Sequence, residues 1–183
     1  EELLKGTCLL AGCAASYGSV LLLCSPKLVC LLFGDKYATA GNLAAILGIG
    51  QAIRLMRGLP TVAAMALGDT GNLLVGNIAR GIGVLCAILV AYRGFPMSAI
   101  AWCATGGEIA ALLAAVLRFR LKTRVNVYRH IKICVAIGWA PSLAAIVWAF
   151  GLASTLPTVA MMLGAVLGGI SLIGMLAQLR ELR

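Results

Sequence analysis

The chain is dominated by apolar runs of roughly twenty residues, the length that an α-helix needs to cross ~30 Å of hydrocarbon. Leu, Ala, Ile, Val and Gly fill these runs, and only 11% of the 183 residues are charged. About a quarter of the residues of a soluble domain are charged, so this composition excludes a soluble core with a polar surface. The alternating pattern of an outer-membrane barrel is missing. The sequence predicts an all-α, polytopic transmembrane helix bundle, one membrane domain over residues 1–183.

Turn residues and charges divide the chain into six predicted spans. Pro26 is predicted to end the first span, and the segment "PKLVCLLFGDKY" after it is too short to cross, so we expect it at the membrane interface. The basic run "RFRLKTRVNVYRHIK" is predicted to be a loop between the fourth and fifth spans. The six spans cover residues 4–24, 43–67, 73–91, 98–117, 133–152 and 157–178.

Lysine and arginine residues are divided unequally between the two sides that these spans define. An even number of spans places both termini on the side of the basic loop. That side has nine basic residues and the opposite side three, so the positive-inside rule makes the first side cytoplasmic. The nine are Lys5, Arg118, Arg120, Lys122, Arg124, Arg129, Lys132, Arg180 and Arg183, and the three are Lys27, Lys36 and Arg93. We expect a multi-pass protein of the bacterial inner membrane with both termini in the cytoplasm.

This asymmetry accounts for the net charge of +9, so no nucleic-acid partner is expected. The basic loop is interpreted as a topology signal, and binding of anionic membrane lipids is the alternative. The seven cysteines are scattered without a CxxC pair, and His130 is the only histidine. The sequence contains no Ser/His/Asp set, paired carboxylates or phosphate-binding loop. We therefore expect no enzyme activity, no metal and no cofactor.

Four charged residues fall near the middle of predicted spans. Arg54 and Arg57 lie in "QAIRLMRGLP", Arg80 in the third span and Glu108 in the fourth. Each such charge costs a few kcal/mol and survives where it faces a bundle interior, a partner or water. Helical spacing places each charge on a stripe of small and polar residues. The stripes are Gly50, Arg54, Arg57 and Thr61; Gly76, Asn77, Arg80 and Gly83; and Ser98, Trp102, Thr105 and Glu108. We predict that they face one hydrated cavity.

Three arginines and one glutamate leave an excess of positive charge in this predicted cavity. Arginine cannot discharge itself by losing a proton, and its fork matches phosphate oxygens. A phosphate or pyrophosphate is therefore the expected guest. The alternative is that Arg54 or Arg80 pairs with Glu108 while the other arginines reach toward the interface. Glu108 itself either orients an arginine or carries a coupling proton.

Two stretches resemble a known family of membrane proteins. "PKLVCLLFGDKYATAGNLAAILGIG" resembles the part of polysaccharide exporters in which a Pro, an apolar run and L-F-G precede Tyr and Ala. "LPTVAAMALGDTGNLLVGNIARGIGVLCAILVAYRGFPMSAIAWCATGGE" resembles the next part of these exporters, up to an Ala-rich helix with Gly-Glu. The chain is thus similar to the C-terminal half of a flippase of the multidrug/oligosaccharidyl-lipid/polysaccharide (MOP) exporter superfamily. One departure is Pro96–Met97–Ser98, where members usually have a second glycine.

The resemblance implies a two-lobe exporter that moves undecaprenyl-pyrophosphate-linked oligosaccharide outward for surface polysaccharide biosynthesis, driven by an ion gradient. This chain, which begins with Glu1 instead of Met, would be a fragment that lacks the N-terminal lobe. Arg54, Arg57 and Arg80 would bind the pyrophosphate, and a polysaccharide polymerase or another assembly protein would be a partner. The alternatives are a drug/cation antiporter of the same superfamily and a non-transporting membrane scaffold.

Overall fold

The structure is a computed structural model that describes residues 2–123, 132–134, 137, 143–144 and 157–181. Its long helices are α1 (Glu2–Phe33), α2 (Ala38–Ala66), α3 (Gly71–Tyr92), α4 (Met97–Thr123) and α7 (Pro157–Glu181), and the short 3-10 helix η1 (Asp35–Tyr37) joins α1 to α2. No strand occurs in these described ranges. The predicted all-α class is therefore confirmed.

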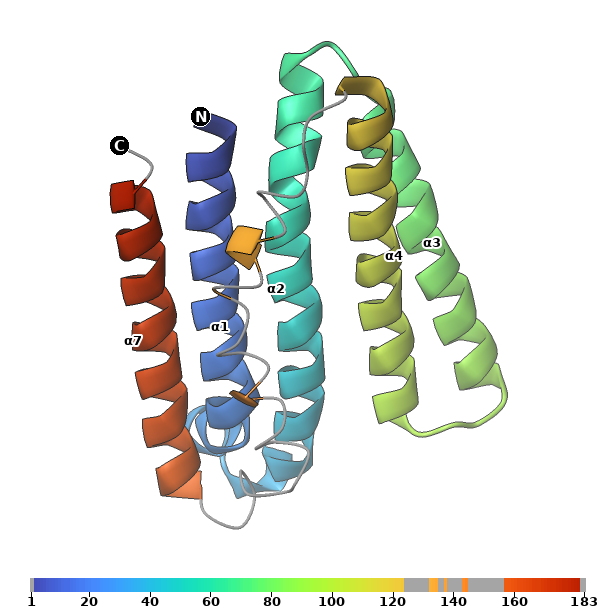
Figure 1. Cartoon of the computed structure of the whole chain (residues 1–183). Coiled ribbons are helices and arrows are strands. Elements are labelled where there is room, and N and C mark those ends of the chain that lie inside the picture. Colours follow the sequence, from blue (N-terminus) through green and yellow to red (C-terminus); the bar gives the residue numbers. More distant parts are fainter. Residues whose placement is uncertain (1, 124–131, 135–136, 138–142, 145–156, 182–183) are drawn as a thin grey trace.

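The long helices stand side by side in the order α7, α1, α2 and α4, with α3 packed on the far side of α4 (Figure 1). The N-terminal end of α1, the C-terminal ends of α4 and α7, and the α2–α3 turn lie at one end of the bundle. Helix η1 and the α3–α4 turn lie at the other end. The described basic residues of the N-terminus, of α4 and of α7 thus share one end of the bundle, and the orientation of that end in a membrane stays a prediction.

Four helices are long and apolar enough to cross a membrane: Lys5–Phe33, Gly71–Tyr92, Met97–Thr123 and Thr158–Arg180. These helices indicate a membrane-embedded protein. Helix α2 is of similar length but carries Arg54 and Arg57, and it is not among the four. It nevertheless packs between α1 and α4, so it occupies the same depth as two apolar helices. The fifth predicted span, 133–152, lies largely outside the described residues, and the count of six spans stays a prediction.

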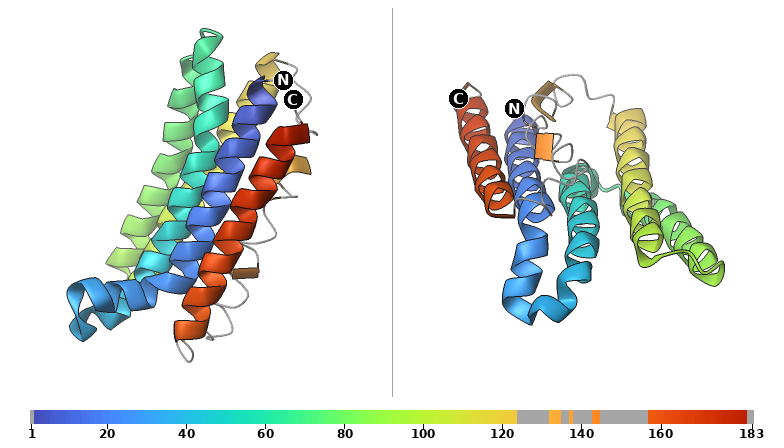
Figure 2. Two further views of the ribbon diagram at one scale, coloured as in Figure 1. Left: turned by 90° about the vertical axis from the view of Figure 1, so that its left-hand side faces the viewer. Right: turned by 90° about the horizontal axis from the view of Figure 1, so that it is seen from below.

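The prediction that Pro26 ends the first helix is wrong, because α1 continues through it to Phe33. The last part of α1 instead turns away from the axis of the rest of the helix (Figure 2). A proline inside a helix removes one backbone hydrogen bond and kinks the helix. The Ser25 hydroxyl also donates to the carbonyl of Leu21 one turn earlier, a bond that often bends helices.

The prediction that a loop begins at residue 118 is also wrong, because α4 continues to Thr123. No Gly or Pro lies between Val116 and Thr123 to stop the helix. The extra turns place Arg118 and Lys122 on one helical face, where both contact Asp69. The contacts with Asp69 therefore stabilise helical turns at the end of α4. The run of positive charges had led us to predict a loop there.

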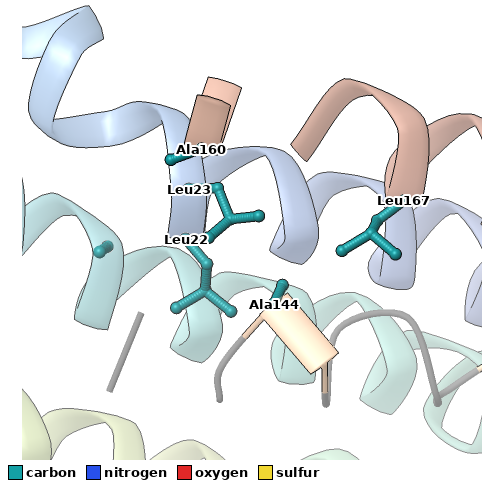
Figure 3. Close-up of a cluster of buried hydrophobic side chains, with 6 residues drawn as sticks. Leu22, Leu23, Ala144, Ala160 and Leu167 are labelled. Atoms are coloured by element: carbon teal, nitrogen blue, oxygen red, sulfur yellow. The ribbon is translucent and has the colours of Figure 1, made fainter. Parts of the chain in front are cut away.

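The core of the bundle lies around α1 and is built from small and aliphatic side chains. One cluster joins α1 to α2, α7 and Ala144 (Figure 3); its members are Leu22, Leu23, Ala45, Ala144, Ala160 and Leu167. Gly164 and Gly168 of α7 lie directly on α1, and a Cβ at either glycine would come within 3.1 Å of an α1 side chain. The Ser16 hydroxyl donates to the carbonyl of Gly168 at 3.0 Å. This close packing holds α1 and α7 together.

Candidate anion-binding site

Three of the four predicted mid-membrane charges meet where α2, α3 and α4 pack together. Arg57 Nη2 lies 4.0 Å from Glu108 Oε2, and Arg80 Nη1 lies 3.8 Å from Glu108 Oε1. Each carboxylate oxygen therefore faces a different guanidinium group. Both distances exceed the 2.7–2.9 Å or so of a charge-assisted hydrogen bond. The three residues form an ion cluster, the α2–α4 charge cluster, in which the pairing is electrostatic and loose.

The α2 and α4 members of the α2–α4 charge cluster are buried, and its α3 member is partly exposed. Arg57 and Glu108 are each only 8% exposed, whereas the side chain of Arg80 is 37% exposed. Glu108 Oε2 is buried and has no hydrogen-bond partner among the described residues. A buried charged oxygen without a donor is costly. Two guanidinium groups and one carboxylate leave an excess of one positive charge, and the arginine N–H groups not aimed at Glu108 remain able to bind an oxyanion.

Glycines allow the helices to approach closely enough for this meeting. A Cβ on Gly83 of α3 would overlap the Cα of Gly107 of α4 and would lie 2.8 Å from the carbonyl oxygen of Cys103. A Cβ on Gly76 would lie 3.2 Å from Arg57 Nη1, so the missing side chain makes room for the guanidinium group. On α2, Gly50 contacts Thr105 of α4. The predicted stripes of small residues therefore lie at the helix contacts that position the charges.

Arg54 does not join the α2–α4 charge cluster. Three residues turn a helix by about 300°, so Arg54 and Arg57 point about 60° apart around α2. Arg54 is exposed and lines an open groove of about 670 Å³ between α1 and α2, the Arg54 groove. Its other lining residues are Leu10, Tyr17, Gln51, Leu55, Gly58, Leu59 and Val62. Within the part of the chain that the structure describes, Arg54 forms no ion pair.

The other residues of the predicted stripes also divide into a buried group and an exposed group. Gly50, Thr61 and Thr105 are buried, and the Thr105 hydroxyl donates to the carbonyl of Ile46 at 3.2 Å. Asn77 is exposed, and Trp102 is 47% exposed. The structure thus brings Arg57, Arg80 and Glu108 together and leaves Arg54 at a separate surface. The binding roles of these four residues stay predictions.

A second ion cluster was not predicted from the sequence. Asp69 lies in the α2–α3 turn and accepts hydrogen bonds from Arg118, from Nε to Oδ2 at 3.1 Å and from Nη2 to Oδ1 at 3.0 Å. Lys122 Nζ lies 3.0 Å from the same Oδ1. The hydrogen bonds from Arg118, followed by those from Lys122, lower the pKa of Asp69 to about 2. These contacts fasten the α2–α3 turn to the C-terminal end of α4.

Asn72 strengthens the same junction from inside the bundle. It is fully buried, and its side-chain nitrogen donates to the carbonyls of Ala115 at 3.2 Å and Pro60 at 3.4 Å. The sequence offered one signal for this junction, the spacing of four residues between Arg118 and Lys122, which places both on one face if the segment is helical. Placing both residues in a loop concealed that signal.

Comparisons of the chain with protein-family models, curated proteins and solved structures gave no match. The resemblance to polysaccharide exporters therefore stays a prediction. No group of three or more His, Cys, Asp or Glu residues suited to a metal ion occurs within the described ranges. The charges and their placement are therefore the features from which a function can be inferred.

Proposed function

We propose that this chain is the membrane-embedded part of a transporter for an anionic, lipid-linked oligosaccharide, and that Arg57 and Arg80 bind its pyrophosphate. One observation supports the proposal above all: two guanidinium groups from different helices meet at a single carboxylate inside an apolar bundle. Arg57, Arg80 and Glu108 each lie more than two turns from either end of their helices. Headgroups at the membrane surface therefore lie far from this cluster.

The energetics of the cluster favour an anionic guest. Arginine stays charged at any accessible pH, and each charge costs a few kcal/mol at that depth. Glu108 balances only one of the two arginines, so a phosphate that contacts both lowers the electrostatic free energy of the site. The partial exposure of the Arg80 side chain supports entry of the phosphate from the α3 side.

The same reasoning disfavours the alternative of a drug/cation antiporter. A cation-binding cavity needs uncompensated carboxylates, but the buried carboxylate of Glu108 faces two arginines. A non-transporting scaffold would instead place these charges against a protein partner. For the transporter, the proposed location is the bacterial inner membrane, with the basic end of the bundle in the cytoplasm. The oligosaccharide then lies in a hydrated space next to the α2–α4 charge cluster, and the prenyl chain lies in lipid.

The test is transport by the full chain in proteoliposomes that contain a fluorescent prenyl-pyrophosphate-linked sugar. Arg57→Ala is expected to abolish movement of the sugar between leaflets, and Arg57→Lys to retain part of it, because charge remains while the fork is lost. Arg93→Ala, a matched substitution at the exposed end of α3, is the control and is expected to transport normally. Absence of transport by the wild-type chain, or normal transport by Arg57→Ala, overturns the proposal.

A further inference from the structure

The Arg54 groove contains a charge that neither the α2–α4 charge cluster nor the core of the bundle uses. Arg54 lies two residues from the middle of α2, and an unpaired charge at such a depth costs a few kcal/mol. Among the described side chains it has no ion-pair partner. We propose that this groove is the docking surface for a membrane-spanning helix from outside residues 1–183 that carries an aspartate or glutamate near its middle.

The described part of the chain covers three faces of α2 and leaves the face of Arg54 open. Helix α1 packs on α2 at Gly48, and α4 packs on it at Gly50. On a third face, Met56 packs against a core cluster that includes Ile137. Residues two apart lie about 200° apart around a helix, so Arg54 points away from Met56. The open face of α2 is therefore the one that carries the unpaired charge.

The shape and lining of the Arg54 groove suit a second helix. Gly58 lies one turn after Arg54 on the same face, and no atom lies within 4 Å of the position that its Cβ would occupy. A bare glycine lets the backbone of another helix approach closely. On either side of it, Leu55 is 41% exposed and Val62 is 59% exposed. These apolar side chains would pack between the side chains of an arriving helix.

The acidic residues of the chain show that the partner of Arg54 must come from elsewhere. The chain has six of them, and only Glu108 falls near the middle of a helix; the others are Glu1, Glu2, Asp35, Asp69 and Glu181. Glu108 is buried between Arg57 and Arg80. A second copy of this chain therefore has no free carboxylate at the depth of Arg54, and a different helix must supply one.

Depth and chemistry favour a helix over a lipid or a sugar. The phosphates of a bilayer lie about 15 Å from its middle, half the thickness of the hydrocarbon core, and a helix is the element that holds a carboxylate at the middle. A sugar needs many hydrogen bonds, but the groove offers the polar side chains of Tyr17, Gln51 and Arg54 between aliphatic ones. An apolar helix with a single acid matches both the walls and the charge.

The experiment measures association of the full chain with synthetic membrane-spanning peptides in phosphatidylcholine vesicles. Each peptide is a Leu/Ala helix of about 20 residues with an acceptor dye, and its central residue is Glu or, in the matched peptide, Gln. Förster transfer from a donor dye on the chain reports binding. The wild-type chain is expected to bind the Glu peptide more tightly by about ten-fold, which corresponds to about 1.4 kcal/mol.

Two substitutions in the groove separate the contribution of charge from that of shape. Arg54→Leu is expected to bring the ratio of the two affinities near unity, because the charge is lost while an apolar surface remains. Gly58→Leu fills the groove without meeting another atom of the described chain, so it is expected to weaken the binding of both peptides. Arg93→Leu and Gly81→Leu, at an exposed arginine and an open glycine of the α3 region, are the matched controls and leave both affinities unchanged.

A second arm repeats the measurement in vesicles that contain phosphatidylglycerol. The preference for the Glu peptide is expected to persist there, because the added phosphates stay at the membrane surface. Its loss would show that a lipid anion takes Arg54, and this overturns the inference. Equal binding of the two peptides by the wild-type chain, or a preference that survives Arg54→Leu, overturns it as well. No sugar substrate is present in this assay, so its outcome does not depend on the proposed transport.

Discussion

Arg57 and Arg54 lie three residues apart on α2 and have opposite environments. Arg57 is buried against α3 and α4 and faces Glu108, whereas Arg54 is exposed in the groove between α1 and α2. The side chains are chemically identical, so the difference comes from the neighbours that each face of α2 meets. A charge at membrane depth therefore acquires its role from the helix packed opposite it, and substitutions on the two faces test that dependence.

The largest expected effect comes from separating α3 from α4. Gly83→Leu places a side chain where even a Cβ would overlap the backbone of Gly107, so α3 must move away from α4. Arg57 then loses its packing against α3, which is part of what distinguishes it from Arg54. Overpacking against backbone is expected to lower the free energy of unfolding by about 3 kcal/mol. Gly81→Leu, at a position with no atom within 4 Å of its Cβ, is the matched control. Equal thermal unfolding midpoints of the two variants in detergent would show that the α3–α4 contact is not tight.

Alanine substitutions of the two arginines test the comparison directly. Arg57→Ala is expected to destabilise the chain by about 2 kcal/mol, because Glu108 then keeps only the more exposed Arg80 as a partner. Arg54→Ala is expected to change stability by less than about 0.5 kcal/mol, as exposed substitutions usually do. Chemical denaturation in mixed micelles measures both. Equal losses of stability in the two variants would contradict the comparison. The double variant Arg57→Ala/Glu108→Ala tests the ion cluster itself: if it loses less stability than Arg57→Ala alone, the pairing of Arg57 with Glu108 is confirmed.

The smallest effect is expected at the α2–α3 turn, which holds the end of α2 next to α4. The pKa of Asp69 is lowered to about 2, so its contribution is complete above the ordinary pKa of an aspartate and is lost as the pH falls toward 2. Asp69→Asn is expected to lower the unfolding temperature at neutral pH. As the pH falls toward 2, the unfolding temperature of this variant is expected to decrease less than that of the wild-type chain. Unfolding midpoints recorded from about pH 6 to about pH 2 measure this. Asp35→Asn, at an exposed acid, serves as the control, and an Asp69→Asn profile parallel to that of the wild-type chain would contradict the assignment.

The apolar runs predicted the helices well, and the errors have identifiable causes. Hydropathy and turn residues predicted α3 and α7 to within a few residues. Pro26 and the basic run after residue 117 were interpreted as breaks, yet both lie inside helices. Proline bends a helix without ending it where tertiary packing supports both sides, and Gly41 of α2 packs directly on Pro26. Asp69, which lies about fifty residues earlier in the chain, stabilises the end of α4, and the sequence around Arg118 and Lys122 does not identify this partner.

For the candidate site, helical spacing identified the right residue types but not their grouping. The stripes correctly joined Gly50, Arg57 and Thr61 on the buried face of α2. They also included Arg54, because a turn of about 60° between it and Arg57 is within the width of one helical face. Spacing on a single helix reports which residues share a side, and it contains no information on where the neighbouring helix ends.

The sequence by itself determined that this chain forms apolar helices and that arginines and a glutamate lie deep within them, because hydropathy and helical period are local properties. Only the tertiary structure decided that Arg57 and Arg80 face Glu108 while Arg54 faces a groove. Ion pairing acts across space between helices far apart in the chain, and the close approach at Gly83 and Gly107 depends on the packing of whole helices. The division of the arginines is therefore a property of the bundle and not of any one segment.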